Sequence, residues 1–431
     1  MSINTAIKAL HARFILDSRG RPTVEVDAEL QGGLSGRGVA PSGASTGSSE
    51  AVEVRDGDLS QYQGRGVNRA VGSVLEVLAP ALRGLDAADQ RAVDQRLRET
   101  DGSENLSRLG GNAIIAVSMA VCRAAARSRA LPLYRHLAEL AGVKDPLMPL
   151  PMVNIFSGGL HARGGMDVQD FLVLPVGASS YPQALHFAER VRSAAAAELE
   201  SLGLPTLLAD EGGLSPGFQT GVEALRMLTT AIRRAGLEPG REVALGLDVA
   251  ATTLQTPEGY RLAREGRTLS SVQMVEWLER WSQDFALVSV EDGLGEEDWS
   301  GWAHLSARLG NRLQLIGDDL FTTQTARLGR GVAAGIGNAV LVKVNQNGTV
   351  SGTLDVIAQA KASGYATIVS ARSGETEDTF IADLAVGSAA GQIKIGSLRS
   401  SERLAKYNQL LRIQEHSQAA YAGAGALAGR P

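Results

Sequence analysis

The chain has 431 residues, of which 44% are hydrophobic, and a formal net charge of −5. This length accommodates one large barrel and a smaller domain, and the acidic balance without a long basic tract argues against nucleic acid as a partner. No apolar run approaches the roughly 20 residues that span a bilayer, so we expect no membrane partner and a cytoplasmic location. Cys122, the single cysteine, lies in an apolar helical stretch and is expected to be a buried thiol in a reducing compartment.

The first 140 residues predict an α+β domain. Residues 1–30 alternate like two strands around a turn at Asp17–Gly20, and residues 64–140 carry apolar residues at helical spacing. Between them, residues 32–49 are rich in Gly and Ser. This composition is typical of a flexible linker, but the same glycines and hydroxyls would suit a lid over an anion or a metal, and the residues alone leave both interpretations open.

Prolines between residues 146 and 151 mark a domain boundary. Residues 141–416 predict a (β/α) barrel. Six short apolar runs recur in the second half, separated by helix-length stretches such as Ser271–Gln283 and Thr349–Ser363. The active site of such a barrel lies at the carboxyl ends of the strands. The runs are VALGLDVA (243–250), ALVSVEDG (286–293), LQLIGDDL (313–320), AVLVKVNQ (339–346), ATIVSARSG (366–374) and QIKIGS (392–397). The final residues, 417–431, are rich in Ala and Gly and predict a disordered tail.

Acidic residues at the ends of three consecutive runs, Asp248, Glu291 and Asp318, favour a Mg²⁺ site. A single acid at a strand end is usually a helix cap. Three converging acids repel one another, and at about 4 Å and an effective dielectric near 20 each pair costs roughly 4 kcal/mol unless a cation intervenes. A metal explains the pattern more simply than three caps do.

Basic residues end the next runs. Lys343 and Lys394 are either structural partners of the acids or, where neighbouring cations lower the pKa, a base. Arg372 with Ser373 suits a phosphate or carboxylate, and Glu211 lies on a loop where it can act as an acid. These groups together indicate removal of a proton α to a carboxylate followed by loss of a β-substituent. His161, flanked by glycine-rich sequence, is by default an exposed loop histidine.

Long segments between Ala12 and Glu415 resemble the enolase family. The resemblance implies an α/β fold, with an enolase-type (β/α)8 barrel and an N-terminal α+β capping domain. It also implies a homodimer or an assembly of dimers, two Mg²⁺ per active site, and a small phosphorylated carboxylate as substrate; a Lys or His base with Mg²⁺ is known for this superfamily. The matching segments are ILDSRGRPTVEVD, APSGASTGSSEAVEVRDGD, DEGGLSP, LDVAAT, SVEDGLGEEDW, IGDDL, LVKVNQNGT, RSGETEDTFIADLAVG, GQIKIG and RSERLAKYNQLLRI.

The resemblance also implies a role for each matching residue. Asp248, Glu291 and Asp318 match the ligands of the tighter Mg²⁺, and Ser45 matches a lid residue beside the second. The remaining assignments are Lys343 as the base for the C2 proton, Glu211 as the acid that assists departure of the C3 hydroxyl, His161 as an active-site loop histidine, Arg372 and Ser373 as phosphate contacts, Lys394 as the carboxylate contact, and Gly43 and Ala44 as substrate-binding lid residues.

Four positions depart from the family pattern. Ala371 replaces a histidine in the S-H-R-S-G-E segment, and Asp170 replaces the glutamate of Q-E-F, at a carboxylate that works with the acid. Ser157 replaces an asparagine, and Gly293 replaces a proline. The metal ligands, base and anion contacts are intact, whereas the surroundings of the leaving hydroxyl are altered.

Three functions are therefore compatible with the sequence. The first is a working 2-phosphoglycerate dehydratase. The second is a paralogue that completes a different reaction, as carboxyphosphonoenolpyruvate synthase of phosphonate biosynthesis does. The third is a catalytically weak binding or scaffold protein, which the retained acids and lysines disfavour.

Overall fold

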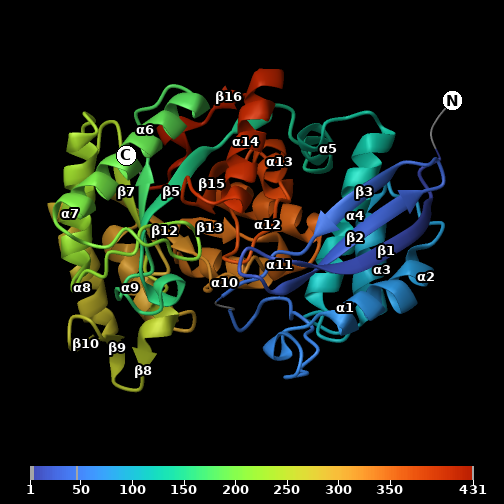
Figure 1. Ribbon diagram of the computed structural model, residues 1–431, viewed down its shortest axis with the longest axis horizontal. Coiled ribbons are helices and arrows are strands. Elements are labelled where there is room, and N and C mark those ends of the chain that lie inside the picture. Colours follow the sequence, from blue (N-terminus) through green and yellow to red (C-terminus); the bar gives the residue numbers. More distant parts are fainter. Residues whose placement is uncertain (1–3, 45–46, 430–431) are drawn as a thin grey trace.

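The computed structural model describes residues 4–44 and 47–429 and consists of two parts (Figure 1). The amino-terminal domain lies at the right of the view, and the barrel with its outer helices fills the centre and left. Within the described residues, no helix has both the length and the apolar content to cross a membrane.

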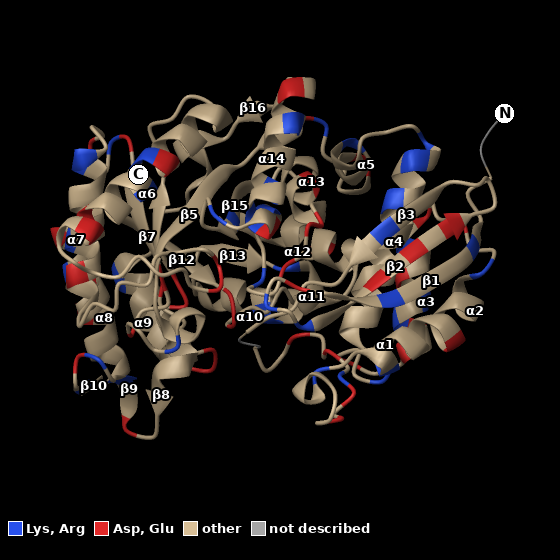
Figure 2. Ribbon diagram, viewed as in Figure 1, with Lys and Arg blue, Asp and Glu red and all other residues tan. Residues whose placement is uncertain are grey.

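The amino-terminal domain packs a three-stranded antiparallel sheet against helices. The Asp17 carboxylate accepts the backbone N–H groups of Arg19 and Arg21, which closes the predicted turn between the first two strands. Acidic and basic residues lie side by side on this sheet (Figure 2), where Arg13 pairs with both Glu25 and Asp27. The elements are β1 (Ile7–Leu16), β2 (Pro22–Leu30), β3 (Ser35–Val39), η1 (Tyr62–Gly64), α1 (Asn68–Gly72), η2 (Ser73–Leu78), α2 (Ala79–Leu82), α3 (Gln90–Asp101), α4 (Gly111–Ser128) and α5 (Leu133–Leu140).

Strand β3 was not predicted, because its glycines suggested a linker. A Cβ on Gly36 would lie 2.3 Å from the Ala120 carbonyl oxygen, and one on Gly38 would lie 2.3 Å from that of Ala116. The glycines therefore allow the backbone of α4 to pack directly on the strand. The linker interpretation is wrong for the described residues 32–44, and residues 45–46 lie outside the described part of the chain.

Eight strands close the predicted barrel, and six of them are the six apolar runs. β6 runs antiparallel to both of its neighbours, and the remaining pairs are parallel. The ring consists of β5 (Leu150–Ser157), β6 (Asp170–Leu174), β7 (Ala244–Asp248), β11 (Leu287–Glu291), β12 (Gln314–Gly317), β13 (Ala339–Val342), β14 (Ala366–Ser370) and β15 (Gly391–Gly396).

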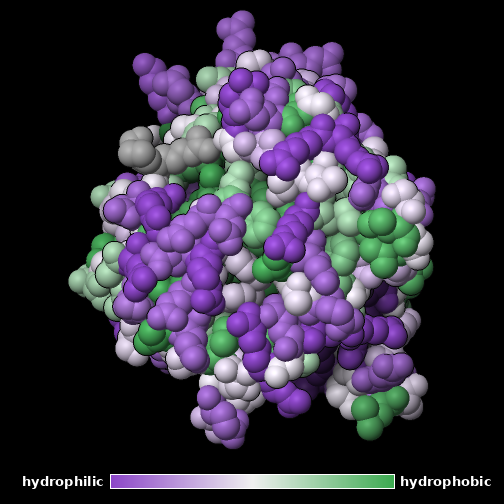
Figure 3. Space-filling view, turned by 90° about the vertical axis from the view of Figure 1, so that its left-hand side faces the viewer, coloured by the Kyte–Doolittle hydropathy of each residue, from purple (hydrophilic) through white to green (hydrophobic). Residues whose placement is uncertain are grey.

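Helices surround the barrel, and their starts carry the caps that the sequence provides. Ser270 and Thr220 form capping boxes with the third residue of their helices, and Thr349 caps α12. The face of the outer helices seen in Figure 3 is mostly hydrophilic. The helices are α6 (Tyr181–Ser201), α7 (Gly221–Arg234), α8 (Ser271–Asp284), α9 (Trp299–Leu309), α10 (Thr325–Ala334), α11 (Val344–Asn347), α12 (Val350–Ala362), α13 (Phe380–Gly387), α14 (Ser401–His416), η3 (Gly159–Ala162) and η4 (Ala251–Leu254). A small sheet comprises β8 (Gln255–Thr256), β9 (Gly259–Leu262) and β10 (Arg267–Leu269).

The prediction of a disordered tail is wrong for the described residues 417–429. Strand β16 (Ala420–Tyr421) pairs with β4 (Leu147–Met148), and η5 (Gly423–Ala426) follows it. Gln392 donates to the Ala426 carbonyl at 2.9 Å, and the side chain of Leu427 is buried in the apolar cluster at the floor of the barrel. Small residues let the tail lie flat, and the floor supplies the apolar contacts and hydrogen bonds that composition alone could not indicate.

Leu427→Ala is expected to lower the free energy of unfolding by about 2–3 kcal/mol, because it leaves a cavity in this cluster. Chemical denaturation measures the change. Leu59→Ala is the matched control, since Leu59 is 82% exposed and its truncation should change the value by less than about 0.5 kcal/mol. Equal effects of the two variants would show that the tail does not stabilise the barrel.

Candidate active site

The polar residues that follow the strands meet at one mouth of the barrel. Glu291 on β11 lies opposite Asp248 on β7, and Asp170 on β6 lies opposite Asp248 from the other side. The cavity between these side chains is small, about 20 Å³, which is room for one or two water molecules. Its lining residues are Ala44, His161, Gln169, Glu211, Asp248, Asp318, Lys343, Ser370, Ala371, Arg372, Ser373 and Lys394.

Lys394 joins two of the predicted metal ligands. Its Nζ donates to Asp248 Oδ2 at 2.8 Å and to Glu291 Oε2 at 2.6 Å, with all three side chains buried. Burial alone would lower the pKa of Lys394, but the two carboxylates outweigh it and raise the pKa well above its ordinary value. The two carboxylates thus favour the ammonium form of Lys394 in this arrangement.

Lys343 contacts the third predicted ligand. Its Nζ lies 2.5 Å from Asp318 Oδ2, and Gln346 donates to the other oxygen of Asp318 at 3.0 Å. Burial and the nearby charges of Arg372 and Lys394 lower the pKa of Lys343, whereas Asp318 raises it, and the net shift is upward. Asp318 therefore favours the protonated form of Lys343, and a second cation beside Asp318 would weaken this effect.

The chemistry of the three acids fits a hard cation. Among the described residues Glu291 Oε1 is buried without a hydrogen-bond donor. Burial, and then the charges of Asp248 and Asp318, raise the pKa of Glu291 well above its ordinary value. An oxygen donor of this kind beside two further carboxylates suits Mg²⁺. The fourth predicted ligand, Ser45, lies outside the described residues.

The three acids are not gathered as closely as the sequence suggested. In the described part of the chain, two groups offer ligand atoms that all lie within 4.8 Å of one another, and both differ from the predicted set. One is Asp292 with Asp318 and Asp319, and the other is His161 with Asp170 and Glu211. The Lys394 ammonium lies between Asp248 and Glu291, in the place where a shared cation would balance them.

His161 is buried between two acids, so its prediction as an exposed loop residue is wrong. Its Nδ1 lies 2.9 Å from Asp170 Oδ2, and its Nε2 lies 3.6 Å from Glu211 Oε1. Burial alone would lower the pKa of His161, but Asp170 and Glu211 raise it to about 9. The imidazolium form therefore predominates at neutral pH.

Three of the four departures from the family pattern border this histidine cluster or its cavity. Ser157 Oγ donates to Asp170 Oδ1 at 2.8 Å, so two of the altered residues contact each other directly. Ala371 lines the cavity that His161 also lines. A Cβ on Gly293, by contrast, would meet the side chains of Leu278, Val290 and Leu305. Ser157 and Asp170 thus belong to the histidine cluster, and Ala371 belongs to the wall of the cavity.

The predicted anion contacts Arg372 and Ser373 form part of the wall of the same cavity. Arg372 donates to Glu50 at 2.7 Å and to Asn345 at 3.0 Å, and Glu50 outweighs the effect of burial and raises the pKa of Arg372. Ser373 Oγ accepts from Arg19 at 3.1 Å. On the lid, Ala44 lines the cavity, and Gly43 beside it is half-buried.

The lid backbone is attached to this wall. Ser42 exchanges two backbone hydrogen bonds with Gly374, at 2.9 and 2.8 Å. The described beginning of the lid is therefore held beside Arg372 and Ser373.

Sequence reasoning missed several residues that hold the predicted ones in place. The Asp292 carboxylate accepts the backbone N–H groups of Asp318 at 2.9 Å and Asp319 at 2.8 Å, which fixes the loop carrying a predicted metal ligand. Gln169 donates to Asp248 at 3.2 Å, and Glu50 pairs with Arg372. Asp292 directly follows Glu291 in sequence, which was an available signal. Nothing local identified Glu50, because its partner is 322 residues away.

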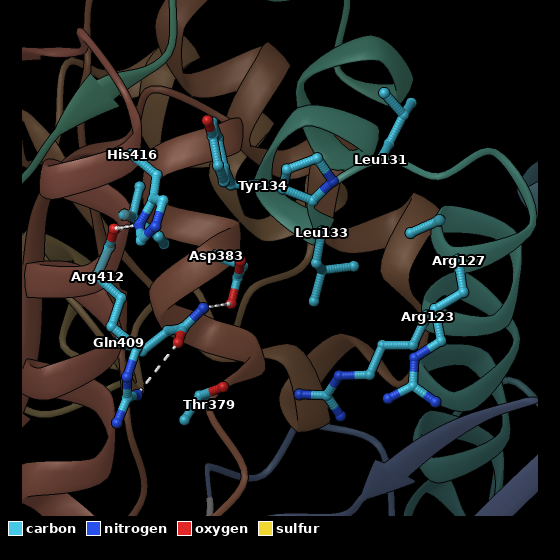
Figure 4. Close-up of a pocket in the computed structure, with 13 residues that line it drawn as sticks. Arg123, Arg127, Leu131, Leu133, Tyr134, Thr379, Asp383, Gln409, Arg412 and His416 are labelled. Atoms are coloured by element: carbon cyan, nitrogen blue, oxygen red, sulfur yellow. Dashed lines mark hydrogen bonds between the residues drawn. The ribbon is translucent and has the colours of Figure 1, made fainter.

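A separate cavity of about 470 Å³ lies where α4 and α5 meet α13 and α14 (Figure 4). Its polar side chains bind one another, since Gln409 donates to Asp383 at 3.1 Å and His416 contacts the Arg412 carbonyl at 2.7 Å. None of its lining residues lines the barrel mouth. The chemistry therefore lies at the mouth, where buried charges converge.

Comparison with known families agrees with this architecture. Residues 7–137 match the family model described as Enolase, N-terminal domain, and residues 145–429 match Enolase, C-terminal TIM barrel domain. Together the two matches extend over most of the chain. The protein is a member of the enolase family, with the α/β barrel and amino-terminal cap of an enolase-superfamily hydro-lyase or a closely related enzyme.

Proposed function

We propose that the protein is a Mg²⁺-dependent lyase that converts 2-phosphoglycerate to phosphoenolpyruvate. The observation that carries this proposal is the placement of Lys343 and Glu211 in one cavity that Arg372, Ser373 and Lys394 also line. This set provides a base, an acid and contacts for both negative groups of the substrate.

The residues divide the reaction between them. Lys343 takes the C2 proton, Arg372 and Ser373 hold the phosphate, and Lys394 holds the carboxylate. Asp248, Glu291 and Asp318 would hold one Mg²⁺ and Ser45 a second, and the bound metal would supply stabilisation of the charge that develops on the substrate carboxylate.

Departure of the C3 hydroxyl needs a proton, and His161 holds one. Burial raises the pKa of Glu211, but the charges of His161, Arg403, Lys394 and Lys343 outweigh burial and lower it. The opposite shifts of the two pKa values favour a carboxylate at Glu211 and an imidazolium at His161, whose facing atoms lie 3.6 Å apart. We assign His161 as the proton reservoir, Glu211 as the group that delivers the proton, and Asp170 as the carboxylate that orients the imidazole.

A second candidate is an enzyme that abstracts the same proton from a related phosphorylated or phosphonylated carboxylate but does not eliminate water. The contact of Ser157 with Asp170, the partner of His161, favours this candidate, as does Ala371 in the wall of the same cavity. A scaffold role has no comparable support, since buried charge pairs are costly to maintain and often stabilise no better than apolar residues.

Purified protein with Mg²⁺ and 2-phosphoglycerate is expected to produce enol absorbance, and EDTA is expected to abolish it. Lys343→Met should lower both dehydration and C2 proton exchange in D₂O by about 10²–10⁴-fold, because it removes the base. Glu211→Gln should lower dehydration and retain exchange.

Lys8→Met is the matched control, because Lys8 is an exposed partner of Glu29 on the amino-terminal sheet. Exchange without dehydration in the wild type would favour the second candidate. Absence of both reactions, with no Mg²⁺-dependent binding of 2-phosphoglycerate, would contradict both enzymes.

Ala371→His is expected to raise dehydration if the absent histidine limits proton delivery. The kcat for 2-phosphoglycerate should rise about tenfold or more, within the range of an acid–base participant. Ala371→Gln is the matched control, since it adds comparable bulk without a titrating group. An equal response to both substitutions would show that proton delivery at residue 371 is not limiting.

A homodimer is also proposed, together with a cytoplasmic location that the buried thiol of Cys122 supports. The edge strand β1 exposes apolar side chains, with Phe14 43% and Leu16 53% exposed, and Phe14 contacts the ring of Tyr62 at 5.9 Å between centroids. An exposed apolar edge is a usual site of subunit contact.

Light scattering after size exclusion is expected to show a dimer, and Leu16→Asp is expected to shift it toward monomer. Leu202→Asp, on the barrel and 57% exposed, should leave the mass unchanged. A monomeric wild type would contradict the dimer.

A further inference from the structure

A larger cavity opens directly beside the reaction cavity. It encloses about 620 Å³, within the size range of small-molecule sites, and it shares Ala44 and His161 with the reaction cavity. Arg21, Arg65 and Arg163 also line it. We call this space the arginine vestibule. It meets the reaction cavity at Ala44 and His161.

The vestibule carries an excess of uncompensated positive charge. Within residues 4–44 and 47–429, the guanidinium groups of Arg21, Arg65 and Arg163 have no hydrogen-bond acceptor and no ion-pair partner. Asp210 is the one acid among the lining residues. Burial and the charges of Arg19 and Arg65 lower the pKa of Arg21 by more than Asp17 and Asp210 raise it, so the nearby acids do not fully balance the cations.

Arg163 reaches the vestibule from a strained backbone. It adopts φ 52° and ψ 41°, the left-handed region that glycine occupies without cost and that a long side chain rarely adopts. It directly precedes Gly164, which is also left-handed. The chain keeps an arginine where a glycine would relieve strain, and the exposed Arg163 side chain makes no hydrogen bond or ion pair with the described residues. Such a residue is better explained by a ligand than by folding.

We propose that the arginine vestibule is a subsite for a second oxyanion group, a phosphate, phosphonate or carboxylate, next to the carbon that loses its substituent. The proposal rests on the proposed function, because it takes the primary phosphate to lie at Arg372 and the reacting carbons to lie between Lys343 and Glu211. The second oxyanion belongs either to a substrate extended beyond C3 or to a separate small co-substrate, and both sources share the same chemistry.

Electrostatic steering is the simpler alternative. Three cations at a mouth accelerate the arrival of any anionic substrate without binding a second group. Steering and a subsite predict different effects of the arginines on equilibrium affinity and on association rate. A subsite favours a ligand with two oxyanion groups over a ligand with one at equilibrium, whereas steering changes the association rate of both alike.

The probes are 2-phosphoglycerate, with one phosphate, and 2,3-bisphosphoglycerate, with a second phosphate on C3, titrated calorimetrically with Mg²⁺ present. Arg163→Gln and Arg21→Gln are each expected to weaken bisphosphate binding relative to monophosphate binding by about tenfold, as for one charge-assisted hydrogen bond. Arg163→Gly should do the same while removing the backbone strain, so its loss of binding cannot be attributed to misfolding.

Arg261→Gln is the matched control. Arg261 is exposed on β9 and has no ion-pair or hydrogen-bond partner among the described side chains, and its substitution should leave both affinities unchanged. Binding of a separate co-substrate is tested by titrating inorganic phosphate into protein saturated with 2-phosphoglycerate. Arginine-dependent binding of phosphate identifies a co-substrate, and arginine dependence for the bisphosphate alone identifies an extended substrate.

An unchanged affinity ratio in all three arginine variants overturns the subsite, as does a change confined to association rates. Arginine-dependent bisphosphate binding without any reaction of 2-phosphoglycerate contradicts the proposed function but supports the subsite. Reaction of 2-phosphoglycerate without arginine dependence supports the proposed function and overturns the subsite. The two proposals therefore fail on different measurements.

Discussion

Balance of buried charge at the barrel mouth governs the rest of the site. Five acids there pair with a cation: Asp248 and Glu291 with Lys394, Asp318 with Lys343, and Asp170 and Glu211 with His161. Desolvation makes an unbalanced carboxylate at this depth costly. An anionic ligand or a metal ion that entered this site would therefore exchange one set of ion pairs for another. The protonation of Lys343 therefore depends on whether a second cation also contacts Asp318.

Much of the barrel could be predicted from sequence because its strands are buried on both faces and read as continuous apolar runs. Runs such as 339–342 and 366–369 needed no partner to be recognised. Strand β3 and the tail could not be predicted in this way, because they contain no continuous apolar run. Their glycines and alanines fit the segments that pack against them. Gly36 and Gly38 make room for α4, and Leu427 fills the floor of the barrel. Composition describes a segment alone, whereas both errors arose from neighbours distant in sequence.

The candidate site divides in a similar way. Asp248, Glu291 and Lys394 could be placed at one mouth because strand order fixes where their Cα atoms lie. The bond from Lys394 to both acids could not be predicted, because it depends on side-chain reach across the barrel. The environment of His161 was hidden for the same reason: its loop is glycine-rich, and burial comes from Asp170 on β6 and Glu211 on another loop. Family resemblance supplied residue roles but not their charge states.

The position of the tail also bears on how the protein can be handled. Residues 420–427 cross the floor of the barrel, near the starts of β12 and β15, whereas the charged cavity lies at the opposite ends of these strands. Immobilisation through the carboxyl terminus would therefore leave the mouth facing away from a support. Force applied through such an attachment would act first on the contacts of Leu427 and on the hydrogen bonds of Gln314 and Gln392, before it reached any reacting group.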